Sequence, residues 1–203
     1  MDPHSLVNNP TKQLTMKNLT LYGLLLCLPF GLLAQHEING EVVLPNGLPV
    51  CEVLVELQGP DGAVIAQDVN EMDGTFQFTD VPTGTDYTLV FTKDGSPING
   101  TSTFDLVLLA RLILGLDSQP PYYQWIGDVN GSGSLTTLDL VIIRKVILGI
   151  DLEFPVPAWA FDEPTALIPD NQISLPAVDS DLEVEVIGVK RADINGSAVP
   201  NCQ

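Results

Sequence analysis

Basic residues are few in this chain of 203 residues, which has 8 Lys plus Arg against 26 Asp plus Glu and a formal net charge of −18. Such an acidic chain repels phosphate backbones and anionic lipid headgroups, which argues against nucleic acid and membrane-surface binding. Charged residues make up 17% of the chain and apolar residues 45%. There is therefore enough apolar material to bury a core. The partners that this charge attracts are cations.

Histidine is also scarce. After residue 34 the chain keeps one histidine, His36, near the start of that part, where order is least expected. No Ser-His or Cys-His pair can be assembled on rigid elements from this supply, and the chain has neither a Gly-rich phosphate loop nor a CxxC motif. Paired carboxylates remain open as catalytic groups, but the best organised acids have the spacing of metal ligands. We therefore expect no enzyme.

Residues 1–34 have the pattern of a leader and a signal peptide. From Met16 the chain reads MKNLTLYGLLLCLPFGLLAQ, with a basic start at Lys17, an apolar run over 19–33 and the small residue Ala34. The run is shorter than the roughly 20 apolar residues of a bilayer span. We expect cleavage after Ala34, a mature chain without a membrane span, and a secreted or cell-surface protein of bacterial type. The mature chain would have 25 acids and 6 bases, a net charge of −19.

Cysteine usage follows from the same cleavage. It removes Cys27 and leaves the pair Cys51 and Cys202 in an oxidising compartment. A disulfide between these two residues and two unpaired thiols are both open, because two cysteines are a weak pattern.

Residues 36–93 are expected to form a small antiparallel β-sandwich. The segment CEVLVEL over 51–57 alternates apolar and acidic residues, and turn residues at 59–62, 73–74 and 82–84 separate further short strands. No helical period precedes Ser102. Phe76, Phe78 and Tyr87 alternate with polar residues, which favours core packing over a ligand platform.

The segments INGEVVLPNGLPVCEVLVEL and MDGTFQFTDVPTGTDYTLVF resemble the carboxypeptidase-regulatory-like and Cna protein B-type family of prealbumin-like sandwiches. The resemblance covers about fifty residues. It implies a spacer or display module with a fold related to carbohydrate-binding sandwiches, and it implies no catalysis.

An internal repeat follows the sandwich. Residues 102–116, STFDLVLLARLILGL, align without gaps on residues 136–150, TTLDLVIIRKVILGI. Both copies predict helices, with Thr103 or Thr137 in the capping region, an acid (Asp105, Asp139) in the first turn and a left-handed glycine (Gly115, Gly149) at the end. Because the helices are apolar nearly all round, we expect them to be mostly buried against each other.

A loop with calcium-ligand spacing precedes the second helix. Over 127–139 it reads GDVNGSGSLTTLD, with oxygen-bearing residues alternating from Asp128 and a glycine, Gly133, at the sixth position. This is the spacing of an EF-hand loop, in which the acid at position 12 closes the site and Leu135 turns into the core. Asx and Ser-Gly runs also make ordinary turns, but six agreeing positions before a duplicated helix favour calcium. The predicted ligands are Asp128, Asn130, Ser132, Ser134 through its carbonyl, and Asp139.

The first repeat has only the second half of such a loop. Near the C-terminus, ADINGSA over 192–198 matches GDVNGSG over 127–133, but there the second half is missing. We predict that the two halves meet in a second, split calcium site, with Asp193, Asn195 and Ser197 as early ligands and Asp105 as the late one. The alternative is that ADINGSA is a remnant or a simple turn.

The loop and repeats, over residues 99–150, resemble the dockerin family, whose repeats are a calcium loop followed by one helix. The resemblance implies the same ligand set. The predicted fold class is α+β: an antiparallel prealbumin-like sandwich over 36–93, then a dockerin-like module of two calcium-loop helices over 94–203. Residues 151–181 are expected to be an irregular connection with Trp159 and Phe161 as apolar plugs, and 182–189 one strand beside the helices. Chelation of calcium should then loosen the helices and leave the sandwich folded.

Two functions remain open. One is a secreted, non-catalytic, calcium-stabilised structural or interaction protein, and the other is a docking component of polysaccharide-degrading machinery. The partners to consider are calcium, a cohesin-like or cell-surface protein, and a polysaccharide. Phe104 and Leu138 stand where dockerins of cellulosomes commonly have hydroxyl residues that choose the cohesin, so this chain departs from the family there.

Overall fold

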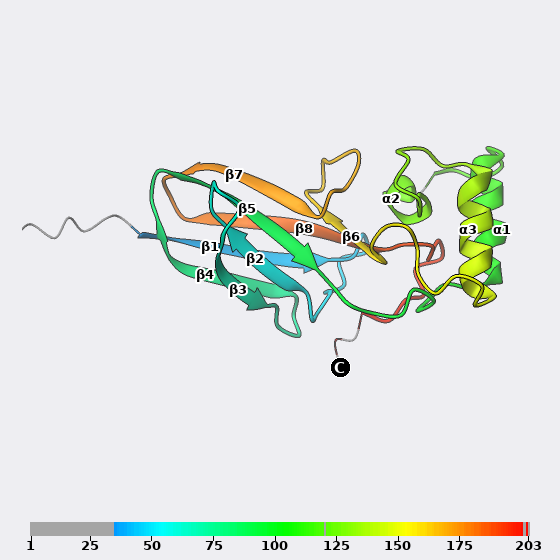
Figure 1. Cartoon of the computed structure of the whole chain (residues 1–203), viewed down its shortest axis with the longest axis horizontal. Coiled ribbons are helices and arrows are strands. Elements are labelled where there is room, and N and C mark those ends of the chain that lie inside the picture. Colours follow the sequence, from blue (N-terminus) through cyan, green and yellow to red (C-terminus); the bar gives the residue numbers. More distant parts are fainter. Residues whose placement is uncertain (1–34, 120, 201, 203) are drawn as a thin grey trace, which may run out of the picture. The chain divides into compact units, whose positions relative to one another are not determined.

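Two four-stranded β-sheets make up most of the structure, a computed structural model that describes residues 35–119, 121–200 and 202 (Figure 1). The sheets have the strand orders β4-β1-β8-β6 and β3-β2-β5-β7. The strands are β1 (Gln35–Val43), β2 (Leu54–Gln58), β3 (Val64–Val69), β4 (Thr75–Pro82), β5 (Thr85–Thr92), β6 (Trp159–Asp162), β7 (Gln172–Val178) and β8 (Leu182–Lys190). The helices are α1 (Thr103–Ile113), α2 (Tyr123–Gly127) and α3 (Thr137–Ile147). The predicted leader and signal peptide lie outside the described residues.

The main core is a cluster of buried side chains contributed by strands of both sheets, as expected for a β-sandwich. Alternate residues of β4 and β5 point inward, so Phe76, Phe78 and Tyr87 are buried as predicted. Trp159 and Phe161 are also in this core, with 1% and 0% of their surface exposed. The β-sandwich prediction is therefore confirmed.

The predicted limits of the sandwich, 36–93, are wrong. Residues 151–181 are not an irregular connection throughout, because they contain β6 and β7. The strand predicted beside the helices is β8, which lies between β1 and β6 in the first sheet. Three strands from the second half of the chain thus complete both sheets, and all described residues belong to one compact unit. The helical segment is an insertion between β5 and β6.

One strand pair is parallel, which the antiparallel prediction missed. β8 runs parallel to β1, with Ile38 opposite Leu182 and Val43 opposite Ile187, and the other strand pairs are antiparallel. A parallel pair requires a crossover between its two strands, and here everything from β2 to β7 lies between them in sequence.

Two smaller clusters of buried residues involve the helical insertion, and the second of them connects it to a sheet. One cluster lies between α1 and α3 and includes Leu109, Ile143 and Ala192. The other joins Trp125 of α2 to Val189 of β8. Within the described residues, no helix has both the length and the apolar character that crossing a membrane requires.

Candidate metal-binding loops and exposed helix face

Both long helices begin with the same cap. Ser102 caps α1 and Thr136 caps α3, each in extended conformation, and each hydroxyl accepts a hydrogen bond from a backbone N–H two residues later. Asp105 and Asp139 complete the capping boxes by accepting a bond from the cap residue's N–H at 2.9 Å. Both carboxylates are almost fully buried. The predicted late ligand of each loop is thus held at the first turn of its helix.

The continuous loop folds around the side chain of Asp128. Its Oδ1 accepts a bond from Ser132 N at 3.0 Å, and its Oδ2 accepts one from Gly133 N at 2.6 Å. Ser132 N also donates to Asn130 Oδ1 at 2.9 Å, and Ser132 Oγ donates to the carbonyl of Ser134 at 3.0 Å. Gly133 has a φ of +75°, so its lack of a Cβ permits the bend. The predicted early ligands therefore lie together.

The split loop repeats this pattern with residues from the start of the helical insertion and from the segment after β8. Asp193 Oδ1 accepts from Ser197 N at 2.9 Å, and its Oδ2 accepts from Ala198 N at 2.8 Å. Ser197 N donates to Asn195 Oδ1 at 3.0 Å. Ser197 Oγ donates at 3.0 Å to the carbonyl of Gly100, which stands 97 residues earlier. In the repeat alignment Gly100 corresponds to Ser134, so each bond has its counterpart in the continuous loop.

The late acids lie beside the early residues in both loops. Asp139 Oδ1 accepts from Val129 N at 3.2 Å, and Asp105 Oδ1 accepts from Asn195 N at 3.2 Å, across 90 residues of sequence. The N–H donor is the second residue of the continuous loop and the third residue of the split loop. The structure thus brings together the two half-loops that the sequence comparison paired.

The charges in the split loop oppose each other. Burial raises the pKa of the Asp193 carboxyl, and the nearby negative charge of Asp105 raises it further. The N–H donors of Ala198 and Ser197 act in the opposite direction. A bound cation would relieve this repulsion.

The donor atoms of both loops suit a hard cation. Each loop offers two carboxylates, an Asn amide oxygen, a Ser hydroxyl and a backbone carbonyl, which are the oxygen ligands of calcium. Both oxygens of Asp128, Oδ2 of Asp193 and the Oδ1 atoms of Asp105 and Asp139 each accept a single N–H bond, which leaves a second lone pair on each. Among the described residues no three His, Cys, Asp or Glu side chains gather as a metal cluster, so a cation here would depend on amide, hydroxyl and carbonyl oxygens as well.

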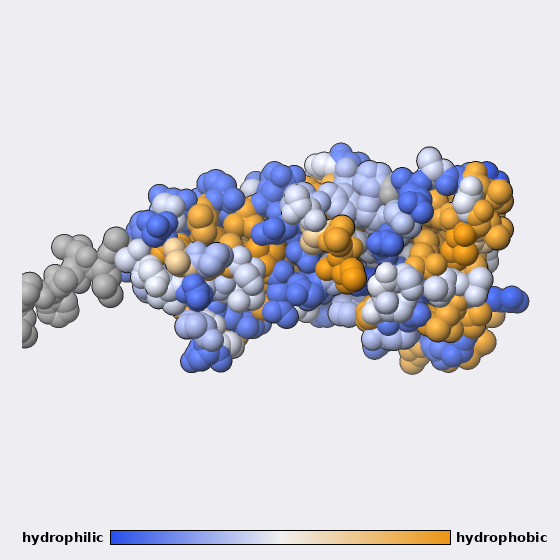
Figure 2. All heavy atoms as spheres, turned by 90° about the horizontal axis from the view of Figure 1, so that it is seen from above, coloured by the Kyte–Doolittle hydropathy of each residue, from blue (hydrophilic) through white to orange (hydrophobic). Residues whose placement is uncertain are grey.

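The prediction that the two helices are mostly buried is wrong in part. Leu109 and Ile143 are buried between the two helices, but α1, α3 and the residues that directly follow each of them also expose apolar side chains, and Figure 2 shows orange spheres gathered over the helical end. We call this set the helix face. Each of its members is more than half exposed and has a counterpart 34 residues away: Phe104 and Leu138, Val107 and Val141, Leu114 and Leu148, Leu116 and Ile150.

The exposed basic side chains of the described residues also lie on these helices. Arg111 forms two hydrogen bonds of 2.6 Å with Asp117, and its repeat counterpart Lys145 pairs with Asp151. Arg144 is exposed on the same side of α3 as Val141. Two of the three basic side chains beside the helix face are therefore paired with aspartates, in a chain that is strongly acidic as a whole.

Cys51 and Cys202 form a disulfide, which decides between the disulfide and the two unpaired thiols that the sequence left open. The bond ties the segment after the split loop to Cys51, three residues before the start of β2. Asn99 and Val199 add two hydrogen bonds, one in each direction, between the start of the insertion and the segment after β8.

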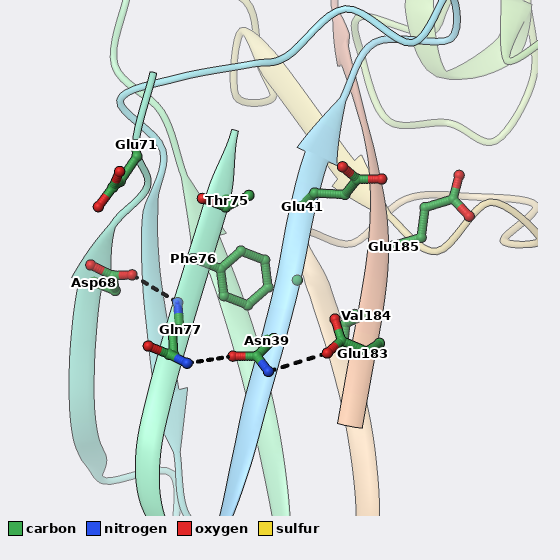
Figure 3. A pocket seen from close by; sticks show the side chains of 11 residues that line it. Asn39, Glu41, Asp68, Glu71, Thr75, Phe76, Gln77, Glu183, Val184 and Glu185 are labelled. Carbon is green, nitrogen blue, oxygen red and sulfur yellow. Dashed lines mark hydrogen bonds between the residues drawn. The ribbon is translucent and has the colours of Figure 1, made fainter. Parts of the chain in front are cut away.

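A hollow of about 700 Å³ lies on the outer face of the first sheet (Figure 3). A chain of hydrogen bonds crosses it: Asp68 Oδ2 accepts from Gln77 N, Gln77 Nε2 donates to Asn39 Oδ1, and Asn39 Nδ2 donates to Glu183. The carboxylates that line it are Glu41, Asp68, Glu71, Glu183 and Glu185. Glu41 stands directly opposite Glu185, a like-charge pair that costs stability.

Two polar groups near the loops were not found by sequence reasoning. The carbonyl of Gly100 has no side-chain signal, and its role appears only once residues 193–198 are placed beside it. Arg191 is a basic residue next to the ADINGSA segment. It is buried, with 6% of its surface exposed, because it contacts residues that are distant in sequence.

His36, which was expected in an unordered end, lies in β1 and forms a hydrogen bond with Asp181 through Nδ1.

Comparisons with known proteins add little. No family model matches the chain, and no curated protein matches it. Solved structures that are similar include BcpA, the major pilin subunit of Bacillus cereus, at 18% identity, with 31% of this chain and 20% of that chain covered and a TM-score of 0.28. A variant of the same pilin gives 18% identity, 30% and 19% coverage and the same TM-score. This chain spans about a fifth of that pilin's length. At these values the likeness carries no argument, and the β-sandwich is established by its strand pairing.

Proposed function

We propose that the chain is a secreted, non-catalytic calcium-binding protein, in which a β-sandwich of the prealbumin type carries a dockerin-like, calcium-stabilised module. The observation that carries the proposal is the agreement between the two loops. Four hydrogen bonds of the continuous loop recur, donor for donor, in a loop assembled from residues 100–105 and 193–198. An ordinary turn needs only residues that are adjacent in sequence, so it gives no reason for two distant segments to complete one loop.

Calcium gives such a reason. In each loop it would be bound by two carboxylates and neutral oxygens, and the carboxylates at Asp105 and Asp193 would no longer repel each other. Because a preformed site is lost on unfolding, binding free energy adds to the stability of the fold. The module would then use calcium to join the start of the helical insertion to the segment after β8.

Calcium titration by isothermal calorimetry tests the proposal. The protein should bind two ions, and both Asp128→Ala and Asp193→Ala should reduce this to one. Asp179→Ala is the matched control, since Asp179 is an exposed acid outside both loops, and it should still bind two ions. Absence of binding would refute the calcium proposal altogether, whereas two ions in the Asp193 variant would refute the split site alone.

A second function is favoured by the helix face. Eight exposed apolar side chains in four repeat-related pairs form a surface of the kind that marks protein interaction sites. We therefore keep the second candidate, a docking component of polysaccharide-degrading machinery whose helix face binds a cohesin-like protein. Pull-down from the secreted fraction of the source organism, with and without calcium, tests it. Capture of a scaffold protein only in calcium supports docking, and no capture in either condition favours the structural role.

A further inference from the structure

Arg191 occupies an unusual position for a basic side chain. Only 6% of its surface is exposed. Its Nη1 donates hydrogen bonds to the carbonyls of Trp125 at 2.9 Å and Asp128 at 2.7 Å. These carbonyls lie in and directly after α2, where a helix presents unpaired acceptors and favours a positive charge. Arg191 thus caps α2 and holds the backbone at the first residue of the continuous loop.

The residues after Arg191 lead directly into the split loop. Ala192 is fully buried, has a φ of +65°, and donates its N–H to the carbonyl of Ile126 at 2.7 Å. Asp193, the first residue of the split loop, follows. A left-handed alanine is uncommon and persists only where its surroundings fix it. The beginnings of the two loops are therefore joined by three hydrogen bonds within a short stretch of chain.

We propose that Arg191 is a positioning residue that couples the two calcium loops, so that calcium in either loop raises the affinity of the other. The proposal depends on the proposed function, in which both loops bind calcium. Calcium in the split loop fixes Asp193, and through Arg191 and Ala192 it fixes the backbone at Asp128 before the second ion arrives. The reciprocal effect must be equal, because coupling is a property of the pair of sites.

The alternative is a purely structural role, in which Arg191 only stabilises α2. A cap of that kind lowers the melting temperature of every form of the protein when it is removed, but it leaves the ratio between binding constants unchanged. The coupling ratio is therefore the measurement that separates the two roles.

The experiment uses calorimetric calcium titration of the full chain. The coupling ratio is the overall constant of the wild type divided by the product of the single-loop constants from Asp128→Ala and Asp193→Ala. We expect a ratio of about ten in the wild type, within the usual range for coupled sites. In Arg191→Gln, measured with the same two loop variants, we expect a ratio of about one with both loops still binding.

Arg144→Gln is the matched control, because it removes the same charge from an exposed side chain of α3, and it should keep the wild-type ratio. If Arg191→Gln does not fold, Arg191→Lys keeps the charge while losing the planar guanidinium, and it should lower the ratio severalfold. An unchanged ratio in the Arg191 variants overturns the inference, and so does a wild-type ratio of one while two ions bind. A protein that binds no calcium overturns the proposed function and this inference together.

Discussion

Removal of the Cys51–Cys202 disulfide should lower the stability of the whole compact unit. The two residues are 151 positions apart, and a bond that closes a loop of this length reduces the entropy of the unfolded chain by an amount equivalent to about 5 kcal/mol. The Cα–Cα distance of 5.3 Å lies within the range that a disulfide spans, so little backbone distortion offsets this gain. The double variant Cys51→Ser/Cys202→Ser should therefore lose up to about 5 kcal/mol of unfolding free energy.

The same change should act locally on the split loop. Without the bond, residues 198–200 are held mainly by the Asn99–Val199 pair and by the bond from Ala198 N to Asp193. If calcium must then order one further residue when it binds, the backbone entropy costs about 1–2 kcal/mol, which corresponds to about a tenfold weaker affinity. The continuous loop contains no residue of this segment and should bind as before.

Urea unfolding with and without the bond measures the first effect, in the presence of a chelator so that calcium does not contribute. Calcium titration in the Asp128→Ala background measures the split loop alone, and titration in the Asp193→Ala background provides the control. Unfolding free energies that agree within about 1 kcal/mol would refute the entropic argument. An unchanged affinity of the split loop, alongside a clear loss of stability, would refute its dependence on the C-terminal anchor.

Two further predictions concern single features of the structure. Burial lowers the pKa of Lys190 to about 8, below its value in the unfolded chain. The unfolded state therefore binds one more proton than the folded state between about pH 8 and 10.5. The unfolding free energy should rise with pH through that window by on the order of 3 kcal/mol. Lys190→Met, unfolded by urea at the two ends of the window in chelator, should lose this increment, and an equal rise in the variant would contradict the assignment. Phe104→Asp/Leu138→Asp should change the unfolding free energy by no more than about 0.5 kcal/mol for each exposed site while it abolishes calcium-dependent capture of any scaffold protein that the wild type retains. Equal capture by the variant and the wild type would exclude the helix face as the docking surface.

Local patterns allowed the sequence to predict the parts of the fold that depend on neighbours along the chain. The alternation of 51–57 and the Asp-Gly turn at 73–74 indicated the strands of the first half, and the repeated acid and glycine of each helix indicated its two ends. β6 was missed because all four of its residues are buried, which leaves no alternation to detect. β7 contains Pro176, which argues against a strand unless the strand lies at an edge, as β7 does.

The partners of strands and exposed faces were beyond such patterns. β8 alternates as a strand should, but nothing in its residues says that its neighbour is β1, more than a hundred residues earlier. The apolar residues of α1 and α3 predicted burial, because composition does not tell a core side chain from one that awaits a partner. The prediction of burial is therefore correct for the sides of α1 and α3 that face each other, and wrong for the helix face, where the same apolar composition is exposed.

The split loop was predictable because its halves keep the spacing of the continuous loop, but its place in the fold changes what it implies. Its late half follows β5, which belongs to one sheet, and its early half follows β8, which belongs to the other. A cation held there would connect the segments that follow two strands of opposite sheets, and so the start of the helical insertion to the C-terminal segment. The expectation that chelation would loosen the helices and leave the sandwich untouched assumed two separate domains. Since the strands of the second half complete both sheets, calcium in the split loop should stabilise the sandwich and the helices as one cooperative unit.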